Sequence, residues 1–466
     1  MEFVSRSRKF IRMESKSHTK HSLWVRITHW INFVVLSVMV WSGALILWAN
    51  RQYPPLLPES FYKSLGLGSR LAEGMSYHFA FMWFFALNTI VYLTYVIVSG
   101  HWREIVPGRG SLKNALLVVA HDLKIRRELP PQGKFNAAQQ FAYTGVLVML
   151  ALALVSGIAI YKPVQLYWLK DAFGNYYIAR LIHYWIALAF ILFFFVHIAQ
   201  VIKAGWKNFS SMVGGKLAFS IFGISIFATF IGWQALRDAP LEDGTRSPLR
   251  QFLQWNENLA EGFVGIDRID QAGGAIPIGR KARVNGLIGL DIKGLESEWL
   301  LNVVTPADKN ILQPQVLTLT MKDLFSFPKV EILSELRCVE GWSEVMSFAG
   351  VPFRTFIQHY SLGTHSGKAP DWENNFSDLY RYVGLETSDG KYYVSIDMKS
   401  MLNPHTMLAY EQNGEPLSAA HGAPLRLYIP NKYGVKSLKR IGKITFSDTP
   451  LNDYWGEYGY DWFLGL

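Results

Sequence analysis

The sequence contains a single cysteine, Cys338, among 466 residues. One cysteine excludes a framework of internal disulfides. It also excludes tetrahedral thiolate zinc sites and iron–sulfur clusters held by cysteines, because both need several thiolates. Any metal in the apolar part of the chain must therefore use other ligands, and histidine is the obvious one.

Charged residues are also scarce. They make up 18% of the chain, whereas 50% of the residues are hydrophobic and 15% are aromatic. Soluble domains carry about 25% charged residues, so this composition indicates a membrane part joined to a globular part. The formal net charge is +10, but the basic residues lie mostly between apolar segments. The positive-inside effect explains that distribution better than nucleic-acid binding, and we expect no nucleic-acid partner.

The N-terminus lacks the short apolar core and small-residue cleavage site of a removed signal peptide. It is polar and basic as far as Arg26. We therefore expect residues 1–23 to form a cytoplasmic leader. The first apolar segment is long enough to remain in the chain as a membrane anchor.

Five segments reach the length of about 20 apolar residues that crosses a bilayer as a helix. Trp and Tyr cluster at their ends, as expected for interfacial anchors. The segments are Trp24–Trp48, Tyr77–Ser99, Gln139–Tyr161, Arg180–Ile202 and Leu217–Leu236. We expect a four-helix membrane domain over residues 24–210 and a fifth transmembrane helix over residues 217–236.

The distribution of Lys and Arg predicts the orientation of these spans. Seven basic residues lie before or at the start of the first span (the last is Arg26), seven lie between the second and third, and three follow the fourth. The other two loops hold three each when Arg180, the first residue of the fourth span, is counted. The positive-inside rule then places the N-terminus in the cytoplasm. After five spans the C-terminal part is outside, so we expect a multi-pass protein of a bacterial inner membrane with a periplasmic C-terminal domain.

Beyond about Asp238 the composition changes, and no further long apolar run occurs. Short alternating runs appear, separated by turn residues such as Ser388-Asp389-Gly390 and Asn413-Gly414. The runs are Val316–Leu319, Tyr392–Ile396, Leu425–Ile429 and Lys443–Phe446. This pattern predicts a mainly β, α+β soluble domain over residues 250–466.

Histidines inside the predicted spans are the first candidate ligands, because polar residues in a membrane are costly and tend to be functional. The fourth span carries His183 and His197. Their separation of 14 residues corresponds to about 21 Å along a helix. At about 100° per residue the two side chains leave nearly the same face. One metal cannot use both, but two haems stacked across the membrane can.

Each of these histidines has a candidate partner at the same depth. His78 begins the second span on the outer side and matches His183, and His29 begins the first span on the inner side and matches His197. For any one of the four, a histidine at the interface or in the core is the more common situation. Two depth-matched pairs favour haem ligands. His101 and His121 lie outside the spans and are interpreted as surface residues.

A resemblance supports this interpretation. The motifs Arg26-Ile27-Thr28-His29-Trp30 and Phe135-Asn136-Ala137-Ala138-Gln139-Gln140, together with the His183/His197 pair, resemble the di-haem cytochrome b subunits of formate dehydrogenases and nickel–iron hydrogenases. The similarity covers about residues 20–210. It implies two b-type haems and electron exchange with a membrane quinone.

Cys338 taken alone is best interpreted as a small buried hydrophobic residue, which a lone cysteine usually is. Its context is Leu336-Arg337-Cys338-Val339-Glu340-Gly341-Trp342-Ser343. A second cluster follows, with His421-Gly422-Ala423-Pro424-Leu425-Arg426 and then Lys432-Tyr433-Gly434-Val435-Lys436-Ser437-Leu438-Lys439-Arg440. Its Arg and Lys side chains supply donors for a phosphate or another anion, although a basic run alone is usually a solvated face.

Together these segments resemble the sulfite-oxidase-type molybdopterin fold, especially the bacterial exported branch that includes the periplasmic methionine sulfoxide reductases. The match covers about residues 250–466, and it departs from that branch at His421, where asparagine is usual. By this resemblance Cys338 is the catalytic thiolate ligand of molybdenum, a soft ligand suited to such a metal. Other residues match positions that hold the pterin and its phosphate: His421, Arg426, Lys436, Lys439, Thr387 and Asn256.

The sequence thus predicts a membrane-bound oxidoreductase that joins oxygen-atom chemistry at a periplasmic molybdopterin to quinone through two b haems. The substrate would be a small oxyanion or a sulfoxide, and the direction of electron flow is left open. So are a homo-oligomer and a periplasmic electron-transfer partner. The alternative is a haem electron-transfer module whose soluble domain binds a partner and is not catalytic.

Overall fold

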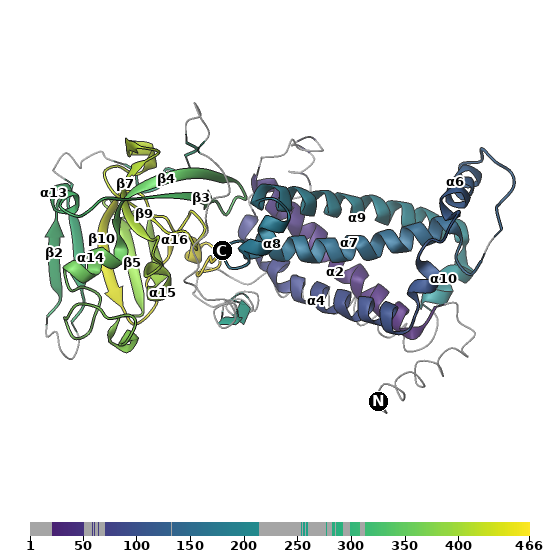
Figure 1. Cartoon of the computed structure of the whole chain (residues 1–466), viewed down its shortest axis with the longest axis horizontal. Helices are drawn as coiled ribbons and strands as arrows, with labels where there is room; N and C mark the ends of the chain where they lie inside the picture. Colours follow the sequence, from purple (N-terminus) through teal and green to yellow (C-terminus); the bar gives the residue numbers. More distant parts are fainter. Residues whose placement is uncertain are drawn as a thin grey trace. The chain divides into compact units, whose positions relative to one another are not determined.

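The structure is a computed structural model, and it describes two parts of the chain. The described residues are 21–50, 70–131, 133–213, 299–307 and 313–466, with a few single residues and short segments between these ranges. The N-terminal part is helical and the C-terminal part is rich in β-strands (Figure 1). The predicted fifth transmembrane helix, residues 217–236, and the leader as far as residue 20 lie outside the described residues.

Four long helices make up the helical part. They are α2 (Leu23–Asn50), α4 (Leu71–Val98), α7 (Ala137–Tyr161) and α9 (Tyr176–Ala204). All four are long and apolar enough to cross a membrane. They coincide with the first four predicted spans, so the helical membrane architecture is confirmed.

Local signals in the sequence set where two of these helices begin and end. At the start of α7, the Asn136 side chain accepts from Gln139 N (2.8 Å), and the Gln139 side chain accepts from Asn136 N (3.1 Å). This reciprocal pair satisfies amide donors that the first helical turn leaves free. Gly205 follows α9 with φ +75°, a left-handed conformation that glycine adopts readily at a helix C-terminus.

The interior of the bundle is apolar, with one polar bridge. Val35, Phe85, Leu150, Ile186 and Phe190 form a buried cluster contributed by all four long helices. Between α2 and α4, the Asn88 side chain donates to Thr28 O (3.0 Å) and Asn32 Oδ1 (2.7 Å). Polar bridges of this kind hold helices together where the surrounding lipid offers no hydrogen-bond partner.

Short helices accompany the long ones. They are α5 (Trp102–Ile105), α6 (Ser111–Asp122), α8 (Tyr167–Ala172) and α10 (Trp206–Val213). The end of α6 is tied to the end of α9, because Asp122 pairs with Lys203 and accepts from the Gln200 side chain (3.0 Å).

The C-terminal part contains two five-stranded sheets. In the first the strand order is β2-β1-β10-β5-β6, formed by Gln315–Leu319, Leu301–Thr305, Ile441–Ser447, Tyr382–Thr387 and Tyr393–Asp397. In the second the order is β3-β4-β7-β8 with β9 beside β7, formed by Val330–Arg337, Ser343–Pro352, Met407–Gln412, Glu415–Pro416 and Arg426–Tyr428. All pairs are antiparallel except β1 with β10.

One buried core joins the two sheets. Val303 and Ile444 enter it from the first sheet, and Val351, Leu408 and Leu427 enter it from the second. Short helical turns connect the strands: α13 (Met321–Phe325), α14 (Phe353–His359), η2 (Phe376–Asp378), α15 (Met398–Met401), η3 (Ala419–His421) and α16 (Tyr454–Glu457). This mainly β, α+β domain confirms the predicted fold class.

Candidate functional site

The helical part brings the four predicted histidines together in two pairs. The ring centres of His78 on α4 and His183 on α9 lie 6.3 Å apart. Those of His29 on α2 and His197 on α9 lie 6.0 Å apart. These are the partners that matching depth in the sequence predicts.

The spacing fits a metal held between two imidazoles. A metal–imidazole nitrogen bond is about 2 Å and the ring centre lies about 1 Å beyond the nitrogen, so two imidazoles that hold one metal between them would have centres about 6 Å apart. Both pairs meet this condition. His183 and His197 sit about 21 Å apart along α9, with Ile186 and Phe190 of the apolar cluster between them. The arrangement therefore suits two separate haems.

A hydroxyl on α7 orients His183. Ser156 Oγ lies 3.0 Å from His183 Nδ1 and itself donates to the carbonyl of Leu152 at 2.6 Å. Since its proton is already used, the hydroxyl accepts from Nδ1–H. The Ala153 carbonyl is a second acceptor for His183. The lone pair of His183 is thus on Nε2, the arrangement in which a metal ligand donates its other ring N–H to a neighbour.

Small side chains and backbone groups make room for the ring. A Cβ on residue 157 would lie 3.3 Å from His183 Cε1, so Gly157 allows α7 to approach the ring closely.

His78 hydrogen-bonds to the backbone of Met39 on α2. In the pair of His29 and His197, His29 Nδ1 is buried and has no hydrogen-bond partner among the described residues. The two pairs therefore differ in how their ligands are supported.

Cys338 lies in the tight turn that joins β3 to β4. Its N–H donates to Trp342 O and its carbonyl accepts from Gly341 N, both at 2.8 Å. Gly341 has φ +87°, which a residue with a side chain would adopt only with strain. The Trp342 ring is fully buried, and the Arg283 guanidinium lies 4.6 Å above it. The Cys-Val-Glu-Gly-Trp motif therefore fixes the thiol at a rigid position.

The thiol of Cys338 is shielded from water by the protein. Cys338 is 4% exposed, and burial raises its pKa to about 12, although hydrogen bonds from the backbone of Glu340 and Val339 act in the opposite direction. A bound metal removes the proton from a coordinating thiol outright. A buried neutral thiol in a rigid turn is therefore suited to hold a metal and poorly suited to act alone as a nucleophile.

Two buried basic side chains, Arg426 and Lys439, lie close to each other. Arg426 is fully buried, its guanidinium stacks on Phe348 at 5.1 Å, and burial lowers its pKa to about 10. Lys439 Nζ donates to Gly286 O (2.9 Å) and Ala420 O (2.8 Å). Its pKa is lowered to about 7 by burial and by Arg426. The charges of Arg426 and Cys338 both act on Lys439, so Lys439 lies close to each of them.

Nothing in the described residues neutralises these cations. Neither Arg426 nor Lys439 forms an ion pair there, and Arg426 Nε is buried without a hydrogen-bond partner. Burying an unpaired charge is costly unless an anion completes the site. His421 is adjacent: its carbonyl accepts from Arg426 (3.2 Å), and its Nδ1 lies 2.8 Å from Ser418 Oγ. Burial lowers the pKa of His421. The donor set therefore fits a phosphate such as that of molybdopterin.

Three other predicted contacts have different surroundings. Lys436 is buried, pairs with Asp453 and donates to Ser395 O (3.0 Å), so its charge is already balanced. Thr387 is buried on β5, and its hydroxyl donates to Asp389 Oδ1 (2.6 Å). Asn256 is buried in a segment of which few residues are described. The structure places His421 and Lys439 beside Arg426 and places Lys439 near Cys338, whereas the charge of Lys436 is already balanced by Asp453.

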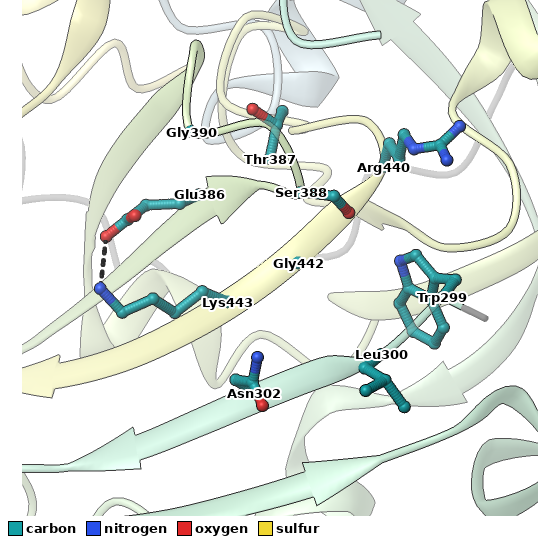
Figure 2. Close-up of a pocket in the computed structure, with 10 residues that line it drawn as sticks. All are labelled: Trp299, Leu300, Asn302, Glu386, Thr387, Ser388, Gly390, Arg440, Gly442 and Lys443. Carbon is teal, nitrogen blue, oxygen red and sulfur yellow. Dashed lines mark hydrogen bonds and ion pairs between the residues drawn. The ribbon is translucent and has the colours of Figure 1, made fainter. Parts of the chain in front are cut away.

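A half-open cavity of about 330 Å³ lies beside Thr387 on the first sheet (Figure 2). Figure 2 shows Arg440 and Trp299 on one side and the Lys443–Glu386 ion pair (3.0 Å) on the other. Ser388 Oγ and Arg440 Nε are buried without a hydrogen-bond partner among the described residues. These donors could hold a small anion, and Thr387 links the cavity to the predicted cofactor contacts.

Comparison with known proteins identifies the membrane part. The family model of prokaryotic cytochrome b561 matches residues 20–215. The putative protein-methionine-sulfoxide reductase subunit YedZ1 of Azospira oryzae is 31% identical over 190 residues, which are 41% of this chain and 93% of that relative. The chain belongs to the prokaryotic cytochrome b561 family. As in that family, the helical part is an integral membrane module for b-type haem.

The C-terminal part of this cytochrome b561 family member matches the oxidoreductase molybdopterin binding domain over residues 291–455. The protein-methionine-sulfoxide reductase catalytic subunit MsrP of Campylobacter jejuni is 33% identical over 147 residues, 30% of this chain and 48% of that relative. A second match named YedZ1 from Azospira oryzae covers 31% of this chain and 50% of the relative at 34% identity. The chain thus spans about half the length of these two relatives.

Among solved structures, the sulfane dehydrogenase SoxCD from Paracoccus pantotrophus matches 41% of this chain and 47% of its own. The sequence identity is 20% and the TM-score is 0.27. A TM-score this low does not establish a common fold.

The sequence motifs miss several residues that the structure places at these sites. Ser156 supports His183, and the only signal for it is a hydroxyl inside an apolar span. Arg283 stacks on Trp342, and Phe348 stacks on Arg426. No motif announces these last two contacts, because they join segments far apart in the sequence.

Proposed function

We propose that the chain is a membrane oxidoreductase that reduces sulfoxides at a molybdopterin site with electrons drawn from quinol through two b haems. The observation that carries this proposal is the pairing of histidines at both ends of α9, with ring centres 6.0 and 6.3 Å apart. Two such pairs make a path for single electrons across the membrane. The names of the relatives YedZ1 and MsrP favour a methionine sulfoxide as the substrate.

The overall reaction balances with these partners. Reducing a sulfoxide to a thioether takes two electrons and two protons and releases one water. Oxidising one quinol to quinone supplies two electrons and two protons. The reaction at the molybdopterin site takes two electrons, whereas each haem carries one at a time. The electrons from quinol must therefore pass through the haems in two steps.

In the β-rich domain, the residues of this chain would bind and shield the cofactor. When bound, molybdopterin supplies two-electron oxygen-atom chemistry. Cys338 would be the protein thiolate on the metal, held by the turn to Trp342. Arg426 and Lys439 would hold the phosphate, because they are buried cations that lack an anion among the described residues.

In the membrane domain, His29 with His197 and His78 with His183 would hold the two haems. Ser156 would keep the lone pair of His183 on Nε2. The excess of Lys and Arg supports a cytoplasmic N-terminus and a cytoplasmic segment between α4 and α7. With the predicted fifth span, the molybdopterin domain would be periplasmic in a bacterial inner membrane.

The decisive experiment combines metal analysis with a redox spectrum. Purified full-length protein should contain about one molybdenum per two haems, and adding a methionine sulfoxide should oxidise pre-reduced haem. Haem without molybdenum, with no oxidation by any sulfoxide, would favour the electron-transfer module that binds a partner. Oxidised haem that sulfite reduces would reverse the direction proposed here.

A further inference from the structure

Helix α6 (Ser111–Asp122) carries an apolar stripe that no described residue covers. The stripe consists of Leu112 (63% exposed), Leu116 (63%), Val119 (46%) and the C-cap residue Leu123 (66%). Steps of four, three and four residues at about 100° each confine these side chains to an arc of about 60°. A globular protein would not normally leave such a continuous row in water.

The rest of the helix surface shows that α6 is docked and not loose. Ala115 and Val118 are buried on a different side of the helix. At its C-terminus, Asp122 pairs with Lys203 and accepts from Gln200 on α9. The helix runs at a steep angle to the four long helices at one end of the bundle (Figure 1). Since α9 ends at Ala204, α6 lies at the level where a membrane helix leaves the apolar layer.

The residues around the stripe match the chemistry of a lipid surface. Arg109, Lys113 and Lys124 are exposed and form no ion pair within the described residues. Just before α6, Trp102 is 43% exposed with the Arg103 guanidinium 5.0 Å from its ring. Tryptophan favours the membrane–water boundary. An apolar face with basic neighbours is the composition of helices that lie in that boundary and attract anionic headgroups.

We propose that α6 lies flat in the lipid–water boundary, with the apolar stripe among the acyl chains and the three basic side chains on anionic phospholipid headgroups. The bilayer is the occupant that the position favours, because it adjoins the end of α9 whether or not another protein is present. A second copy of the chain or another protein would have to displace lipid from the same place. The proposal is independent of the haems, the molybdopterin site and the side of the membrane.

The test places a fluorescent label on either side of the helix in the full-length, haem-loaded protein. Leu116→Cys puts the label on the apolar stripe, and Asn114→Cys puts it about 160° away on the same exposed helix. Leu123→Cys is a second stripe position, should the first variant fold poorly. Native Cys338 is buried, and the chain without an added cysteine measures its background labelling. The proteins are placed in vesicles of phosphatidylcholine with phosphatidylglycerol.

Lipids that carry a quencher near the headgroup should quench the labels at 116 and 123 several-fold more than the label at 114. An aqueous quencher should show the reverse order. Equal access of the aqueous quencher to 116 and 114 would overturn the proposal. So would protection of 116 that depends on the protein-to-lipid ratio, because that result indicates a second copy.

A charge test addresses the headgroups separately. Removing phosphatidylglycerol should reduce lipid quenching at 116, and the combined change Arg109→Gln, Lys113→Gln and Lys124→Gln should abolish that dependence. Glutamine keeps a polar side chain of comparable size while removing the positive charge. Equal quenching with and without phosphatidylglycerol in the unchanged basic background would overturn the assignment of anionic headgroups.

Discussion

At the scale of single residues, hydrogen bonds to the ligands decide which atoms are available to a cofactor. His183 gives its Nδ1–H to Ser156, with the Ala153 carbonyl as a further acceptor, and this leaves Nε2 with the lone pair. His29 Nδ1 has no partner within the described residues. An acceptor on the distal nitrogen makes an imidazole more basic and stabilises the oxidised metal. The two haem sites should therefore differ in reduction potential.

Ser156→Ala should raise the potential of the haem held by His78 and His183 while both haems remain bound. The reason is the loss of one acceptor from His183, with the Ala153 carbonyl still present. We expect at most about a tenfold change in the reduction equilibrium, or about 59 mV for one electron. A spectroscopic redox titration of the full chain measures it.

The matched control for this change is Ser37→Ala. Ser37 lies on α2 and also donates to the carbonyl four residues earlier (2.7 Å to Phe33 O), but it is exposed. Ser37→Ala should leave the reduction potentials of both haems unchanged. Ser156→Thr should keep the original potential, because threonine also carries a hydroxyl. Identical potentials in Ser156→Ala and the unchanged protein would show that the hydroxyl plays no part.

Cys338→Ser should abolish turnover with sulfoxides and leave the haem spectrum intact. Oxygen is a poor replacement for a soft thiolate on molybdenum, and the haem ligands lie in a separate domain. If Cys338 is only a buried structural residue, the serine hydroxyl costs about 1–3 kcal/mol of stability and leaves the chemistry unchanged. Turnover per bound molybdenum, with haem content as the folding control, separates these outcomes.

Lys439 should make the β-rich domain more stable as pH rises when the cofactor is absent. Burial and Arg426 lower the pKa of Lys439 to about 7, whereas the unfolded chain keeps its ordinary value near 10.5. Between those values the unfolded state binds more protons, so the free energy of unfolding rises with pH, by at most a few kcal/mol. Denaturant unfolding of protein made without molybdopterin, followed by tryptophan fluorescence, measures the slope.

Lys439→Met should flatten that slope. Lys443→Met is the control, because Lys443 is half-exposed and paired with Glu386 on the same sheet. Loading the cofactor should also reduce the slope, since a phosphate beside Lys439 favours its charged form. A slope that persists in Lys439→Met would assign the effect to other groups.

At the scale of elements, the sequence predicts periodic features well and long-range contacts poorly. The four spans follow from apolar length. Helix α4 begins at Leu71, six residues before the predicted Tyr77. The charged residues Arg70 and Glu73 interrupt the apolar run in the sequence, but in the structure they pair with each other (2.5 Å). The histidine pairs follow from helical rise alone. The parallel pairing of β1 with β10 could not be predicted, because about 140 residues separate the two strands.

His183→Ala should remove the haem at one end of α9 and leave the other in place. Each pair has its own ligands, and buried apolar side chains separate the pairs. The haem-to-protein ratio should fall by half, and one of two redox steps should disappear. His197→Ala should remove the other step, and two intact haems in both variants would contradict the pairing.

At the scale of the whole molecule, each half alone predicts only part of the function. The cytochrome b561 module predicts electron transfer, and the molybdopterin domain predicts two-electron chemistry. The motif around Cys338 locates the predicted metal ligand, and resemblance supplies the pterin contacts. Lys436 shows the limit of that resemblance, because only the structure reveals its buried pair with Asp453. No sequence motif describes how electron transfer in the membrane module is coupled to the chemistry of the molybdopterin domain.

The predicted topology can be checked on the whole chain with reporters. A reporter that is active only in the periplasm should be active after Leu466 and inactive when inserted within residues 113–134. The excess of Lys and Arg in the latter segment gives this orientation. The opposite pattern of activity would place the molybdopterin domain in the cytoplasm and require a different route for substrate.

In the proposed arrangement α9 supplies one ligand to each haem site, so the number of residues between His183 and His197 sets the distance between the two sites. One inserted residue would turn everything beyond it by about 100° and shift it by about 1.5 Å. One histidine would then point away from its partner while the other stayed in place. Substitutions between the two histidines can accumulate during evolution. An insertion or deletion there would break one of the histidine pairs and interrupt electron transfer between the two sites.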